Sequence, residues 1–308
     1  GLNLILRAGK SDLAIIQLTW YALFLTDRFL YQQGGRVSTH ILRLVQRYPH
    51  ARELSNSYNL LASMVHTHNK SYQFSIQQHE KGYEIGLENG EIARAAINLS
   101  NSLFLRLARG DNLRVIQERA QASQVLSNSK AVFTPMSNNI ARLAGALLEP
   151  SQKAKHILDD DAFPVEYINK IKGSLHEGHL LNYRSELAFW YGDYQKSLEI
   201  SSHSHDFLTR IPKLCCYIEH LIQYALLLTS QASKLSPKGI KDLEFCHQKL
   251  QELSEFCPEN FEHKYQLLLA EQGRYQNQPM AQVTTHYQQA IRSAKAQGFL
   301  QYQALANE

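Results

Sequence analysis

The stretch that decides the fold is Asn260-Phe261-Glu262-His263-Lys264-Tyr265, together with the residues that follow it to Glu308. Apolar and small side chains recur in it at steps of three and four residues, which is the spacing of one helix face. The clearest series is Val283, Tyr287, Ala290 and Ala294. Gln278-Pro279 interrupts the pattern because proline breaks a helix, and Gly298 supplies the left-handed conformation that ends one. The stretch therefore predicts two helices folded back on each other.

The rest of the chain carries helical signals, and no β-hairpin signature interrupts them. Gly34-Gly35 is expected to end the first helix, and Pro164 to open a long one. The helices predicted before the closing pair are 13–31, 37–47, 52–68, 72–88, 92–107, 113–126, 132–148, 164–191, 194–206, 214–230 and 240–256. A loop or soft boundary is expected at 150–163, between N-terminal repeats at 1–149 and C-terminal repeats at 164–308.

Two turns share one pattern, Gly110-Asp111-Asn112 and Gly192-Asp193-Tyr194, each followed by a small or apolar residue three positions later. Glycine permits the tight reversal, aspartate caps the incoming helix, and a small residue lets the two helices approach. This is typical of the inter-helix corner of a tetratricopeptide repeat. The fold class predicted is therefore all-α, an α-solenoid of antiparallel helix pairs with degenerate repeats.

Composition limits the partners. With 308 residues and 44% hydrophobic content the chain can bury a large core, and a net charge of +4 is small for a nucleic-acid-binding protein. Arg36, Arg43 and Arg47 share one helical face, which is either solvated or meets an anionic partner. The four cysteines do not have the regular spacing of a disulfide framework, which favours a reducing cytosol. The most apolar run, 13–25, is too short to cross a bilayer. We expect a cytoplasmic protein without nucleic-acid or membrane partners.

Catalytic motifs are missing from the sequence. It has no phosphate-binding loop, no dinucleotide-binding glycine motif, no kinase catalytic loop and no nucleophile elbow. His176 with His179, and His203 with His205 and Asp206, each fall short of a zinc ligand set, and the carboxylate pairs Glu186/Glu199 and Glu252/Glu255 are expected to be solvated. The sequence predicts a protein that is not an enzyme and that uses no cofactor or metal.

One aromatic cluster has two interpretations. Phe189, Trp190 and Tyr191 stand just before the second corner, and Tyr194 stands within it. They form either the packing seam of the repeat corner or the wall of a ligand groove.

The tail beginning Cys257-Pro258-Glu259-Asn260-Phe261 and ending Ala304-Leu305-Ala306-Asn307-Glu308 resembles the end of the helical-repeat region in large bacterial multidomain signalling kinases. Further stretches are similar to the same region: Glu80-Lys81-Gly82-Tyr83-Glu84, Ala188-Phe189-Trp190-Tyr191-Gly192 and Ala296-Gln297-Gly298-Phe299. Those proteins join a serine/threonine-kinase-like domain, a STAND-type ATPase, the repeats, a GAF sensor and often a histidine kinase. The resemblance implies a fragment of a longer signalling protein.

Two functional hypotheses follow. The first is a regulatory scaffold that relays state between an ATPase and kinase domains, with those domains or another protein as partners. The second is a small-molecule sensor, similar to the sugar-binding repeats of some STAND-type regulators. Leu300, Ala304 and Leu305 begin an apolar face near the end of the chain, so this last helix is expected to fray or to mediate self-association.

Overall fold

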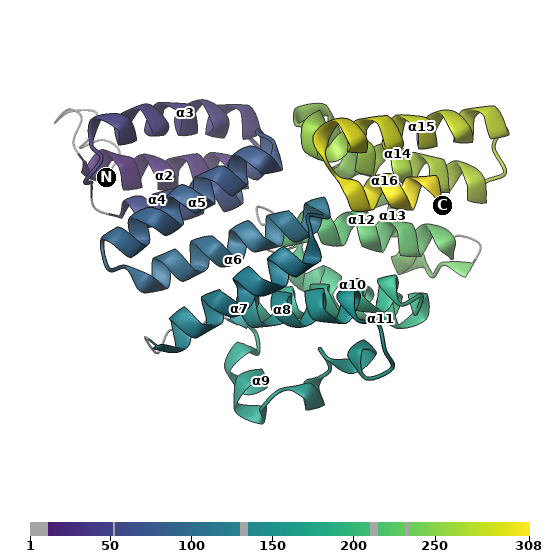
Figure 1. The fold of residues 1–308 in the computed structure, drawn as a ribbon. Coiled ribbons are helices and arrows are strands. Elements are labelled where there is room, and N and C mark those ends of the chain that lie inside the picture. Colours follow the sequence, from purple (N-terminus) through teal and green to yellow (C-terminus); the bar gives the residue numbers. More distant parts are fainter. Residues whose placement is uncertain (1–11, 52, 130–134, 210–214, 232–233) are drawn as a thin grey trace. The chain divides into compact units, whose positions relative to one another are not determined.

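The computed structural model describes residues 12–51, 53–129, 135–209, 215–231 and 234–308. Throughout these ranges the chain forms α-helices and short 3-10 helices and no strand, so the all-α class is confirmed (Figure 1). Successive helices pack against each other in both of the compact units into which the chain divides. Unit 1 is formed chiefly by residues 12–106, and unit 2 chiefly by residues 107–121, 135–209 and 216–308.

Unit 1 is built from two helical hairpins and parts of two further helices. Its elements are α2 (Leu13–Asp27), α3 (Tyr31–Arg47), α4 (Leu54–Met64), a 3-10 turn (His66–His68), α5 (Tyr72–Glu88), most of α6 (Ile92–Arg109) and the part of α7 (Leu113–Ser129) that begins at residue 122. The α2 helix packs against α3 and α4, and α4 packs against α5. The bounds of α5 agree with the predicted helix 72–88, whose N-terminus is capped by the Ser71 hydroxyl.

Gly34-Gly35 does not end the first helix, and that prediction is wrong. The α2 helix ends at Asp27, the chain turns through Phe29 at φ 60°, and both glycines lie inside α3. A Cβ atom at Gly34 would lie 2.7 Å from the Thr26 hydroxyl oxygen. The glycine therefore serves the close approach of α3 to α2, and a contact of this kind is not visible in the local sequence.

The core of unit 1 contains a buried polar cluster. His79 donates from Nδ1 to Asn98 Oδ1 at 3.1 Å, and its Nε2 accepts from the Ser63 hydroxyl at 3.3 Å. Asn98 in turn donates to the Ser55 carbonyl at 3.0 Å. His66 lies nearby, fully buried and edge-on to Phe74. Burial lowers the pKa of His79 to about 4 and that of His66 to about 3, so both side chains are neutral at pH 7.

Unit 2 holds the remaining helices. They are the start of α7 (Leu113–Ser129), then α8 (Pro135–Leu148), α9 (Val165–Ile171), α10 (Leu175–Trp190), α11 (Tyr194–Leu208), α12 (Cys215–Ser230), α13 (Pro237–Phe256), α14 (Pro258–Tyr275), α15 (Met280–Gln297) and α16 (Leu300–Asn307). The α10 helix packs against α8 and α11, and the helices from α13 to α16 each pack against the next. The predicted closing pair is confirmed as α14 and α15, with Gly298 at φ 76° after α15.

Residues 164–191 form two helices instead of the single one predicted. Gly173 adopts φ 71° between α9 and α10, and the Ser174 hydroxyl caps α10 by accepting from the His176 amide. The stretch 150–163 lies inside unit 2 and contains two 3-10 turns, Ala154–His156 and Asp160–Ala162. Arg142 holds it by donating to two of its carbonyls, so the division between the units does not fall there.

The two predicted corners differ by one residue in register. At the second corner Asp193 caps α11, and Ser197 is fully buried and bonded to Ser185 on α10. At the first corner Asn112 performs the capping, because Asp111 pairs with Arg109 at 3.2 Å. Helix α7 consequently begins one position later, which leaves Val115 exposed and buries the next residue, Ile116.

The final helix extends from Leu300 to Asn307 and packs within unit 2. Tyr302 and Ala306 of α16 are buried, and α16 packs against α14 and α15. Leu300 and Ala304 remain exposed on the other face. Self-association through this face stays a prediction.

Candidate functional site

A buried ion pair lies at the centre of the candidate site, within unit 2. Lys264 on α14 has a side chain that is 0% exposed, and its ammonium lies 2.9 Å from Oε1 of Glu219 on α12. Tyr302 on α16 donates to the other oxygen of Glu219 at 2.8 Å, and Lys264 also donates to the Asn260 carbonyl. Three helices therefore meet at a charge pair that is withdrawn from water.

Aromatic rings surround the ammonium of Lys264. It lies 4.7 Å from the ring centroid of Phe299 and 4.9 Å from that of Tyr302. His263 packs against the same two rings. Ring faces carry partial negative charge, so they stabilise a desolvated cation. Burial, with Glu219 next to it, raises the pKa of Tyr302 well above its ordinary value, which keeps the phenol a donor.

A second carboxylate, Glu186 on α10, lies close to this pair. Burial raises the pKa of Glu186 to about 7, and the charge of Glu219 adds to the rise, whereas a hydrogen bond from the Trp190 side chain opposes it. Glu186 is half-buried and faces a cavity, so it is not the fully solvated side chain that the sequence predicts. Its helical position is polar in sequence, but Glu219 of α12 and Tyr302 of α16 lie close enough to interact with it in the tertiary structure.

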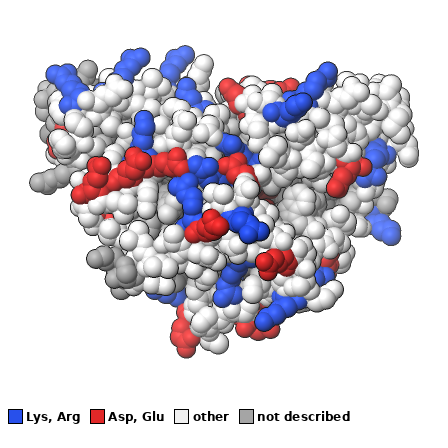
Figure 2. All heavy atoms as spheres, in the orientation of Figure 1, with Lys and Arg blue, Asp and Glu red and all other residues white. Residues whose placement is uncertain are grey.

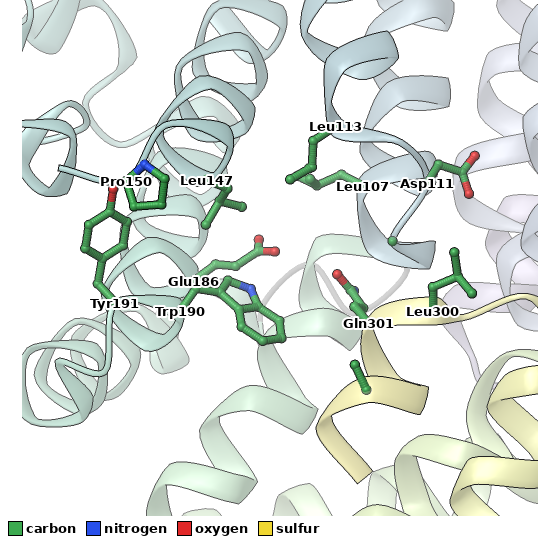
Figure 3. A pocket seen from close by; sticks show the side chains of 12 residues that line it. Leu107, Asp111, Leu113, Leu147, Pro150, Glu186, Trp190, Tyr191, Leu300 and Gln301 are labelled. Atoms are coloured by element: carbon green, nitrogen blue, oxygen red, sulfur yellow. The ribbon is translucent and has the colours of Figure 1, made fainter. Parts of the chain in front are cut away.

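Glu186 opens on a cavity of about 660 Å³. Figure 3 shows the Glu186 carboxylate and the Trp190 indole directed into it from α10, with leucines from other helices around them. The lining residues are Leu107, Gly110, Asp111, Leu113, Leu147, Pro150, Glu186, Trp190, Tyr191, Leu300, Gln301 and Ala304. The ends of α6, α8 and α10, the start of α7 and one face of α16 thus form a mainly apolar space with few polar groups, which is the usual make-up of a small-molecule site.

The structure divides the predicted aromatic cluster between two cavities. Trp190 and Tyr191 line the large one, while Phe189 and Tyr194 line a smaller cavity of about 220 Å³. The hydroxyl of Tyr191 donates to the Ala146 carbonyl at 2.9 Å, which fixes its ring beside α8. Of the predicted corner residues, Gly110 and Asp111 line the large cavity. Gly192 and Asp193 act in the turn between α10 and α11.

The histidine pairs weighed as metal ligands are not brought together with further ligands. His205 lies 3.1 Å from His220 through their ring nitrogens, and burial lowers the pKa of both. Burial also lowers the pKa of His179 to about 4. Among the residues that the structure describes, no group of three or more histidine, cysteine, aspartate or glutamate side chains has a geometry that would hold a metal ion.

Figure 2 shows one face of the molecule, most of which is uncharged. On this face acidic side chains form a short row at the left, and basic side chains project along the upper left edge. Arg36, Arg43 and Arg47 of α3 are exposed, which agrees with a solvated face and equally with a face that meets an anionic partner. In the part of the chain that the structure describes, no helix combines the length and the apolarity needed to cross a membrane.

Sequence reasoning missed Glu219, Lys264, Tyr302 and Gln301 as site residues. For Lys264 a signal is present, because it shares a helix face with Phe261 and Leu268, both fully buried. A lysine on the apolar face of a helix indicates a buried partner of opposite charge. Which helix carries that partner is decided by tertiary packing.

Comparison with protein-family models, curated proteins and solved structures finds no match to this chain.

Proposed function

We propose that the chain is a non-catalytic helical-repeat module that binds a small molecule in the large cavity of unit 2. The observation that carries the proposal is the cavity itself, whose apolar walls contain one indole and one carboxylate directed inward. Its volume of about 660 Å³ suits a small organic ligand. In the full-length protein such a module would act as a cytoplasmic sensor, as the resemblance to STAND-type signalling proteins implies.

The state of the buried lysine supports the non-catalytic part of the proposal. A nucleophilic lysine needs a neutral amine and access for the substrate. The Lys264 ammonium is instead enclosed, paired with Glu219 and bonded to the Asn260 carbonyl. It is placed to hold α12 and α14 together.

Ligand-observed NMR with a diverse fragment library tests the proposal. Fragments are expected to bind the wild-type chain and to lose binding in Ala304→Phe, because Ala304 is exposed and lines the cavity, where a phenyl ring would take up space that a ligand needs. Met280→Phe, at an exposed position of α15 outside the lining, is the matched control. A library without a single hit that is sensitive to Ala304→Phe would overturn the proposal.

A second candidate is the relay scaffold, in which the helix pairs form a degenerate tetratricopeptide-like array between an ATPase and kinase domains. It is favoured by an exposed apolar row on α2 in unit 1, where Trp20 and Phe24 are each 53% exposed and Leu13 is 56% exposed. Trp20→Ser with Phe24→Ser would then uncouple ATPase state from kinase output in the full-length protein without lowering its melting temperature. Unchanged coupling would refute a role for this face.

A further inference from the structure

The charges around the cavity do not balance within the described residues. Two carboxylates, Glu186 and Glu219, lie close enough to interact, and one ammonium, that of Lys264, is in contact with Glu219. The other acid of the lining, Asp111, is paired with Arg109. Among the described residues no basic side chain forms an ion pair with Glu186, and the Trp190 indole lies beside its carboxylate in the cavity (Figure 3). The cavity therefore presents one carboxylate without a counter-charge.

The walls next to Glu186 also match a cation. The Trp190 indole lines the cavity beside it, and an indole face is the best of the aromatic side chains at attracting a positive charge. Leu107, Leu113 and Leu147 line the same space and offer apolar surface to the body of a ligand. An anionic ligand would meet the Glu186 carboxylate, and the cavity lining contains no lysine or arginine to offset the repulsion.

We propose that the cavity takes a small organic cation, an ammonium or guanidinium group on an apolar body, with the charged head against Glu186 and the body among the leucines. This inference rests on the proposed function, because it names the ligand class of the same cavity. It assigns Glu186 as the specificity-determining residue and Trp190 as its aromatic partner.

Binding of such a cation is linked to the proton on Glu186. The groups that face Glu186 are Glu219 of α12, Tyr302 of α16 and Trp190 of its own helix, with Lys264 of α14 behind Glu219. Without ligand the Glu186 pKa is about 7, so below that pH the carboxyl holds a proton and cannot pair with a cation. Affinity should rise up to tenfold per pH unit below pH 7 and level off above it.

The test compares three probes with the same phenyl body: 2-phenylethylamine as the cation, 2-phenylethanol as the neutral analogue and 3-phenylpropionate as the anion. The chain contains two tryptophans, and Trp20 lies in unit 1, so Trp20→Phe leaves Trp190 as the single indole that reports on the cavity. Fluorescence titrations are run on this background from pH 5.5 to 8.5. We expect the amine to bind at least tenfold more tightly than the alcohol at pH 8, and the anion more weakly than both.

Glu186→Gln is the decisive variant, because the amide keeps the size of the side chain and an acceptor for Trp190. It should lower amine affinity at least tenfold, leave alcohol affinity unchanged and abolish the pH dependence. Glu199→Gln, an exposed carboxylate on the outer side of α11, is the control and should change nothing. Lysine- and arginine-containing tripeptides distinguish a free amine from a protein side chain, and tighter binding of a peptide would overturn the small-molecule source.

Failure of this inference differs from failure of the proposed function. If the neutral probe or library fragments bind in a manner blocked by Ala304→Phe, but amine and alcohol bind equally, the cavity binds ligands and the cation assignment is wrong. If the amine binds and Glu186→Gln has no effect, Glu186 is not the recognition residue. If no probe or fragment depends on the cavity, both proposals fail.

Discussion

Acidification is expected to destabilise unit 1 through its two buried histidines, His66 and His79. Both are enclosed in the neutral form, which lowers their pKa values to about 3 and about 4. In the unfolded chain a histidine titrates near pH 6.5. A lowered folded-state pKa means that the stabilising contribution is fully present above pH 6.5 and is lost as the pH falls toward the folded value.

The magnitude follows from the distance between the experimental pH and the unfolded pKa. One pH unit corresponds to about 1.4 kcal/mol for each group, so between pH 7.5 and pH 5.0 each histidine removes about 2 kcal/mol of stability. The two together remove about 4 kcal/mol, which is a large share of the ~5–15 kcal/mol stability of a typical domain.

Urea unfolding at pH 7.5 and 5.0 measures the effect, with Trp190→Phe leaving Trp20 as the reporter of unit 1. The critical comparison is His66→Leu, because neither ring nitrogen of His66 has a hydrogen-bond partner in the structure and the ring packs on Phe74. This variant should lose about 2 kcal/mol less than the parent between the two pH values. His40→Leu, at an exposed position of α3, is the control. An equal loss in the parent and in His66→Leu would refute the reasoning.

Three further predictions concern stability. Lys264→Met should lower the free energy of unfolding in urea by about 3–5 kcal/mol because it leaves Glu219 buried without its cation. Adding Glu219→Gln should restore part of that loss, and strictly additive losses in the double variant would contradict a coupled pair. Gly192→Ala should cost about 1–2 kcal/mol through its positive φ alone, since a Cβ there meets open space. Gly110→Ala should lower the melting temperature more, because its Cβ would lie 2.8 Å from the Gln301 backbone nitrogen, and the reverse order would argue against the close contact of α16 with the first corner.

The sequence by itself determined the helices and most of their ends. The closing pair, the α5 helix and the two glycine corners follow from spacing, capping and backbone conformation, which act within a few residues. The roles of Ser71 and Gly298 can be predicted from sequence because each acts on the adjacent helix. The Ser71 hydroxyl accepts a hydrogen bond from the first turn of α5, and Gly298 adopts the left-handed conformation that ends α15. The predicted helix ends were wrong at two glycines. Gly34 lies inside α3 and allows its close contact with α2, and Gly173 separates two helices where the sequence predicts one.

The candidate site was decided only by the tertiary structure. Glu186, Glu219, Lys264 and Tyr302 come from α10, α12, α14 and α16, and no local pattern relates positions so far apart in sequence. A carboxylate on a helix looks the same in sequence whether it faces water or a cavity. Its ionisation depends on desolvation and on the charge of its neighbours, and packing between the helices sets both.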